Sequence, residues 1–95
     1  MTKQNKFKKE LAKILLDIDD TDLMLEFLQD LFTPVEFQDV SKRLQIVKRL
    51  SHGESQRKIA KDLNLGIATV TRGSRELKNK KGGFVKVLEK FYDEK

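Results

Sequence analysis

Residues 56–75 decide how this chain folds, and they read QRKIAKDLNLGIATVTRGSR. Apolar residues recur at helical spacing on both sides of Asn64-Leu65-Gly66, a segment with the composition of a tight turn. Ala60 supplies the small side chain that two helices need where they approach closely. The residues expected on the inward faces are Ile59, Leu63, Leu65 and Val70. The stretch therefore predicts a helix-turn-helix over residues 55–78, with Ser55 as the cap of its first helix.

The second helix of this pair is expected to expose small, hydroxyl and basic side chains. Small residues at its N-terminal end let the backbone approach base edges, and basic residues can meet phosphates. The exposed positions are Ala68, Thr69, Thr71, Arg72 and Arg75. Two short packed helices also occur for purely structural reasons, but the spacing and the local excess of basic residues favour nucleic-acid binding.

Charge is concentrated in the same part of the chain. Residues 1–40 carry 5 Lys/Arg and 9 Asp/Glu (net −4), residues 41–81 carry 12 and 3 (net +9), and residues 82–95 carry 3 and 3 (net 0), which together give +5. A basic block inside a folded region is typical of proteins that bind a polyanion, although a solvated basic face would look the same. The candidates for non-specific phosphate attraction are Lys48, Arg49, Lys58, Lys61, Lys78, Lys80 and Lys81.

Helical periodicity extends outward from this motif in both directions. Residues 1–5 are expected to form a flexible arm, residues 6–53 the core helices, and residues 84–93 a last core helix. Thr33-Pro34 with Glu36 has the pattern of a capping box at the start of a helix. The sequence therefore predicts a single all-α domain, residues 1–95, with six helices and no strands.

Composition excludes several functional classes. The 95 residues contain no cysteine and one histidine, His52, so thiolate and His-pair metal sites are excluded and most histidine-based catalysis is not expected. The acidic cluster between Asp17 and Asp22 lacks the glycine and distal glutamate of a calcium loop, and helix capping explains it better. With no apolar run of ~20 residues and no signal-peptide pattern, we expect a cytoplasmic protein with no membrane segment, no catalytic residues and no prosthetic group.

Three segments together resemble the bacterial tryptophan repressor family: Thr33-Pro-Val-Glu through Arg43, Gly53-Glu-Ser-Gln-Arg57, and Gly66-Ile-Ala-Thr-Val-Thr-Arg-Gly-Ser74. The resemblance covers about half of the chain, residues 28–78. It implies an intertwined homodimer that presents two recognition helices to a palindromic DNA operator. The DNA-facing positions that it implies are Gln56, Arg57, Ile67, Ala68, Thr69, Thr71 and Arg72.

The same resemblance implies L-tryptophan as corepressor. Arg72 would bind the ligand carboxylate, and Arg43 with Arg72 would sandwich the indole ring. Gly73 would leave room for the ring, and Thr33 would border the ammonium group. Each has an ordinary alternative: Thr33 caps a helix, Arg43 lies on the surface and Arg72 contacts phosphate. A mid-helix glycine costs about 1 kcal/mol relative to alanine, so Gly73 is expected to have a packing or ligand reason.

The chain departs from the family pattern in two places. Glu76 stands where the family commonly has a serine that reaches the ligand ammonium, and its carboxylate could pair with that ammonium or with Arg72. The connection between Glu54 and Ser55, at the expected hinge from core to head, is one residue shorter than in the family pattern. Three functions therefore stay open: a tryptophan-responsive repressor, a DNA-binding regulator of the same fold with a changed or lost ligand, and a helical protein-interaction adaptor.

Overall fold

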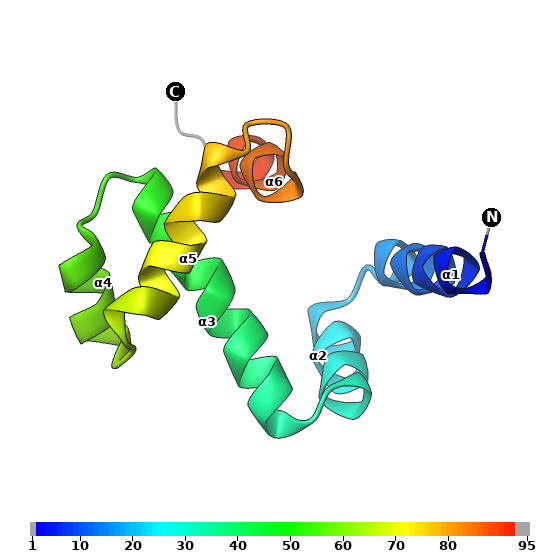
Figure 1. Cartoon of the computed structure of the whole chain (residues 1–95). Coiled ribbons are helices and arrows are strands. Elements are labelled where there is room, and N and C mark those ends of the chain that lie inside the picture. Colours follow the sequence, from blue (N-terminus) through cyan, green and yellow to red (C-terminus); the bar gives the residue numbers. More distant parts are fainter. Residues whose placement is uncertain (1, 93–95) are drawn as a thin grey trace. The chain divides into compact units, whose positions relative to one another are not determined.

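The computed structural model describes residues 2–92, and within them the chain forms six α-helices and no strand (Figure 1). This confirms the predicted all-α class and the helix count. The helices fall into two compact units, one up to Phe37 and the other from Gln38 onward. The expected division into core and head stays a prediction.

The first unit contains α1 (Lys3–Asp17) and α2 (Thr21–Leu31). The expected arm over residues 1–5 is wrong from Lys3 onward, because the Thr2 hydroxyl accepts a hydrogen bond from the Asn5 N–H and caps α1 at 3.2 Å. Asp20 caps α2 in the same way, through the Asp22 N–H. Local capping therefore sets both helix starts.

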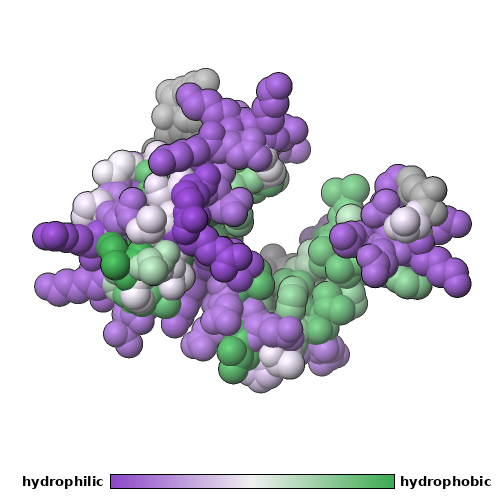
Figure 2. All heavy atoms as spheres, viewed as in Figure 1, coloured by the Kyte–Doolittle hydropathy of each residue, from purple (hydrophilic) through white to green (hydrophobic). Residues whose placement is uncertain are grey.

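Neither α1 nor α2 buries a single side chain. Phe7 is 67% exposed and Leu16 is 84% exposed, and hydrophobic surface covers α2 and the segment leading to it in Figure 2. Burial of apolar area is the main favourable term in folding, so these helices gain little of it within one chain.

Helix α3 (Pro34–Ser51) begins at the predicted capping box. The Thr33 N–H donates to Glu36 Oε1 at 2.9 Å, and the Glu36 N–H donates to the Thr33 hydroxyl at 3.2 Å. Two N–H groups that a helix start leaves unpaired are thereby satisfied. The helix ends just before Gly53, whose φ of +87° lies in the region that favours glycine.

The second unit holds the core, which forms where α4 (Gln56–Leu63) and α5 (Ile67–Lys78) pack on the C-terminal part of α3. Its buried cluster consists of Ile46, Ile59, Ala60 and Val70. Ile59 and Val70 were predicted to face inward, and Ala60 was predicted to lie where the two helices approach closely. Figure 1 shows α5 lying across α3, with α4 along one side of it.

The turn of the helix-turn-helix forms as predicted. Asn64 adopts the left-handed conformation (φ 55°, ψ 51°) that ends α4, and the Leu65 N–H donates to the Ala60 carbonyl at 2.9 Å. The Ser55 hydroxyl caps α4 by accepting from the Lys58 N–H. Helix α6 (Gly83–Tyr92) follows and contacts α5, and the predicted last residue of that helix, at position 93, lies outside the described residues.

Candidate DNA-reading face and ligand pocket

The N-terminal half of α5 presents an exposed face beside the start of α4. Ile67 at its first turn is 49% exposed although it is apolar, and Gly66 before it makes no side-chain cap. The backbone at this end is therefore open to an incoming acceptor. Of the predicted DNA-facing set only Gln56 is partly buried, and the exposed members are Arg57, Ile67, Ala68, Thr69, Thr71 and Arg72.

One hydrogen bond joins the two helices of this face. The Thr71 hydroxyl lies 2.7 Å from Gln56 Oε1 and 3.0 Å from the Ile67 carbonyl oxygen, so it bridges α4 to α5. This contact fixes two predicted DNA-facing residues relative to each other. The face is thus supported by a side-chain bond as well as by the apolar core beneath it.

A pocket of about 480 Å³ lies on another side of α5, between this helix, α3 and α6. A volume of this size is ordinary for small-molecule sites. Four of the five predicted corepressor residues line it: Arg43, Arg72, Gly73 and Glu76. The remaining lining residues are Asp39, Lys42, Ile46, Val47, Leu65, Thr69 and Phe84.

Gly73 lies at the close approach of α5 to α3. A Cβ atom on Gly73 would stand 2.7 Å from Ile46 Cγ2, a separation that carbon atoms do not tolerate. Gly73 is buried there, so packing against α3 is one reason for a glycine in the middle of this helix.

Thr33 belongs to the first unit, whereas every residue that lines the pocket belongs to the second. Its hydroxyl is engaged in the capping box of α3. The capping role that the sequence offered as an alternative is therefore realised, and a ligand role for Thr33 stays a prediction.

Sequence reasoning missed several pocket residues. Thr69 was assigned to DNA alone, yet it lies one turn before Arg72 and Gly73 and shares their face of α5. Asp39 lies one turn before Arg43 on α3, so the same i, i+4 spacing could have found it. Phe84 comes from α6, and no local spacing in the sequence indicates that it reaches the pocket.

The junction between α3 and α4 is held by ion pairs. The Arg49 guanidinium donates to Glu54 through Nη2 (2.7 Å to Oε1) and Nε (3.0 Å to Oε1), and Nη2 also contacts Asp62 on α4. These hydrogen bonds lower the pKa of Glu54 to about 2, lower that of Asp62 and raise that of Arg49. We call Arg49, Glu54 and Asp62 the junction clamp.

The clamp corrects one prediction. Arg49 was expected to attract phosphate, but its side chain is only 18% exposed and two carboxylates already bind it. Lys58 also approaches Glu54, at 3.4 Å, but stays largely exposed. Arg49 therefore serves the junction and is not part of the phosphate-attracting set.

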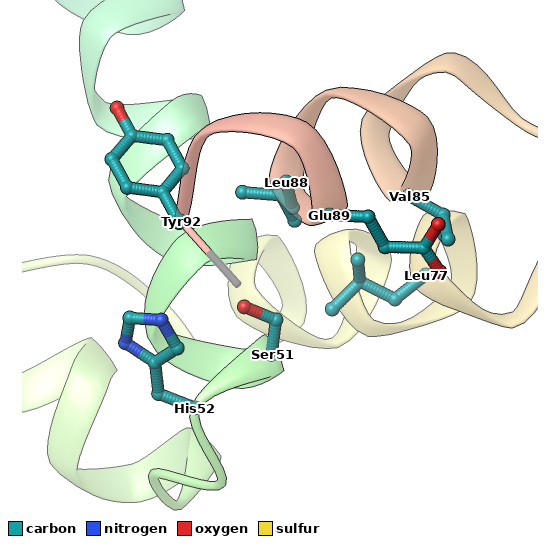
Figure 3. A pocket seen from close by; sticks show the side chains of 7 residues that line it. All are labelled: Ser51, His52, Leu77, Val85, Leu88, Glu89 and Tyr92. Atoms are coloured by element: carbon teal, nitrogen blue, oxygen red, sulfur yellow. The ribbon is translucent and has the colours of Figure 1, made fainter. Parts of the chain in front are cut away.

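A second pocket, of about 750 Å³, contains no predicted site residue (Figure 3). Its lining comes from the end of α3, the end of α5, and α6, and it consists of Ser51, His52, Leu77, Val85, Leu88, Glu89 and Tyr92. Lys48 Nζ lies 4.7 Å from the centroid of the Tyr92 ring.

Across residues 2–92 no cluster of His, Cys, Asp or Glu could hold a metal ion, and no helix there is long and apolar enough to cross a membrane.

Comparison with known proteins identifies the family. The model of the Trp repressor protein family matches residues 7–92. A Trp operon repressor homolog of Vibrio parahaemolyticus is 42% identical over 72 residues, which cover 75% of this chain and 67% of that protein. Homologs from Photobacterium profundum (46% over 59 residues, 61% and 54% covered) and Chlamydia trachomatis (41% over 70 residues, 68% and 74% covered) are also similar. The chain therefore belongs to the Trp repressor family, and it is a Trp-repressor-like regulator of transcription and not an enzyme.

Proposed function

We propose that this chain is a homodimeric repressor that binds a palindromic DNA operator and uses L-tryptophan as corepressor. The observation that carries the proposal is the double role of α5. Its N-terminal residues form the exposed reading face, and Thr69 and Arg72 also line the pocket. A molecule in the pocket thus touches the helix that would read DNA, which gives a ligand a direct route to control binding.

The pocket has the chemistry that an aromatic amino acid needs. Arg72 supplies a planar guanidinium for a carboxylate, and Arg43 on α3 supplies a second cation suited to the face of an indole ring. Glu76 supplies a carboxylate for the ammonium group. Ile46, Val47 and Phe84 supply apolar surface for the ring.

The exposed apolar side chains of α1 and α2 support the dimer. A 95-residue chain whose helices α1 and α2 bury no side chain gains stability if a second copy covers that surface. A two-fold dimer places its recognition helices about 34 Å apart, in successive major grooves of a palindromic site. Such a regulator acts on the chromosome, in the cytoplasm.

A binding selection followed by titration tests the proposal. Duplexes that bind the protein in 1 mM L-tryptophan are enriched from a random-sequence pool, and affinity for the recovered site is then measured with and without tryptophan. We expect a palindromic site, tighter binding with tryptophan, and affinity that falls steeply with salt. The variant Arg57→Ala should weaken binding, whereas Lys13→Ala on α1 serves as the matched loss of a positive charge. If no duplex is enriched over random DNA, the DNA-binding proposal is wrong and an adaptor role is favoured.

A ligand-independent regulator is the second candidate, and Glu76 is the observation that favours it. Its carboxylate lines the same pocket as Arg72 and could form an ion pair with the Arg72 guanidinium in place of a ligand carboxylate. Operator affinity that is equal with and without tryptophan, together with enrichment of a defined site, would select this candidate.

A further inference from the structure

We infer that the junction clamp determines how well the reading face discriminates its operator from other DNA, because the clamp fixes α4 against α3. This inference rests on the proposed function, since it concerns the same reading face. It assigns Asp62 a positioning role. The Asp62 carboxylate acts on DNA recognition through Arg49 and α4, and does not itself touch DNA.

The clamp holds both ends of α4 to one side chain of α3. Glu54 lies two residues before the first residue of α4, and Asp62 lies one residue before its last. Arg49 Nη2 bonds both carboxylates, and the Glu54 N–H also donates to the Arg49 carbonyl at 3.2 Å. Lys58 Nζ, on α4 between them, lies 3.4 Å from Glu54 and 3.8 Å from Asp62. If α4 rotates or slides on α3, one of these charged contacts must break.

The apolar core beneath α4 does not fix its orientation to the same degree. Ile59 and Ala60 belong to the buried cluster that also contains Ile46 of α3, and burial of apolar area has no preferred direction. A guanidinium bonded to two carboxylates is directional, because its N–H groups lie in one plane. The Arg49 side chain is only 18% exposed, so salt screens its contacts less than those of a fully exposed pair.

The clamp adjoins the reading face along the chain. Gln56 follows Glu54 by two residues, and its Oε1 lies 2.7 Å from the Thr71 hydroxyl on α5. Arg57 is the next residue of α4. The position of α4 therefore sets where residues of both helices of the face lie. A dimer carries two clamps, so a displaced α4 affects the fit to both half-sites of a palindrome.

Charge alone predicts the opposite result when Asp62 is neutralised. Asp62→Asn removes one negative charge from each chain and keeps the shape of the side chain. Electrostatic attraction to phosphates should then rise, and DNA of every sequence should bind more tightly. Loss of positioning should instead weaken binding to the operator, because base readout depends on the placement of the reading face, whereas phosphate attraction does not depend on sequence.

Fluorescence anisotropy of the full-length protein tests the inference in the presence of L-tryptophan. It measures the affinity for the operator recovered in the selection described above and for a scrambled duplex, and the ratio of the two affinities measures discrimination. In Asp62→Asn this ratio should fall by about 10-fold, or about 3-fold for each of the two heads, which is the range of a partly exposed ion pair. Affinity for the scrambled duplex should be equal or higher.

Two further variants separate the clamp from other effects. Glu89→Gln on α6 is the matched control, because it removes the same charge from an exposed side chain outside the clamp, and it should keep the ratio. In an Arg49→Gln background no guanidinium remains, so Asp62→Asn should change the ratio by less than about 2-fold. Circular dichroism confirms that each variant is folded at the temperature of the titration, so a loss of stability alone leaves the ratio unchanged.

Three results would overturn the inference. They are an unchanged or higher ratio in Asp62→Asn, an equal fall of the ratio in Glu89→Gln, and the same effect of Asp62→Asn with and without Arg49. If the natural chain enriches no duplex, the proposed function is wrong and the inference is wrong with it. If the natural chain enriches a site and the ratio does not depend on the clamp, only the inference is wrong.

Discussion

Gly73 provides the sharpest test of how α5 packs on α3. Replacement of a mid-helix glycine by alanine normally stabilises a protein by about 1 kcal/mol, because alanine loses less backbone entropy. At Gly73 the new Cβ atom would stand 2.7 Å from Ile46 Cγ2, and Ile46 is only 2% exposed and cannot move aside freely. Overpacking of a tight core costs about 1–3 kcal/mol. We therefore expect Gly73→Ala to destabilise the protein by up to about 2 kcal/mol.

Chemical denaturation at a fixed protein concentration measures this effect, with Gly83→Ala as the control. A Cβ atom at Gly83, also helical, meets nothing within 4 Å, so that variant should gain up to about 1 kcal/mol. In an Ile46→Ala background the collision is removed, and Gly73→Ala should then become stabilising. If Gly73→Ala stabilises the natural chain as Gly83→Ala does, α5 does not pack on α3 in this way.

Three further predictions concern other parts of the molecule. Arg49→Ala should lower the Tm at pH 7. Because the folded-state pKa of Glu54 is lowered from 4.5 to about 2, the difference in Tm between the natural chain and the variant should persist above pH 4.5 and shrink toward pH 2. A difference in Tm that does not depend on pH would contradict the junction clamp. Thr33→Ala should cost about 1 kcal/mol in denaturant unfolding, and Thr33→Ser, which keeps the capping hydroxyl, should cost much less. If α1 and α2 are covered by a second copy, the Tm should rise with protein concentration and sedimentation should give a dimer; a concentration-independent Tm with a monomeric mass would refute this.

Much of the fold could be predicted because its signals are local. The capping box at Thr33 and Glu36, the turn at Asn64 and the inward Val70 each depend on residues within one or two turns of each other. The same local logic failed at Thr2, because a short polar segment with no apolar periodicity was interpreted as an arm although its threonine caps α1.

The pocket and the junction depend on contacts between helices, and these were predicted less well. Arg72, Gly73 and Glu76 were found because their pattern resembles a family, whereas Phe84 arrives from another helix with no sequence signal. Arg49 meets Asp62 across thirteen residues. A basic residue in a basic region gives no indication that it is already paired, so its assignment to phosphate attraction was wrong.

The position of Arg72 means that any control of DNA binding by a ligand in the pocket must obey thermodynamic linkage. Because it borders the pocket and lies next to Thr71 of the reading face, a ligand held by Arg72 and operator DNA on that face both act on α5. If tryptophan tightens operator binding by some factor, saturating operator must tighten tryptophan binding by the same factor. Calorimetry of tryptophan with free and operator-bound protein measures the second factor. If tryptophan tightens DNA binding but the factor measured for tryptophan differs from the factor measured for DNA, the pocket and the reading face are not coupled by a single binding equilibrium of the dimer.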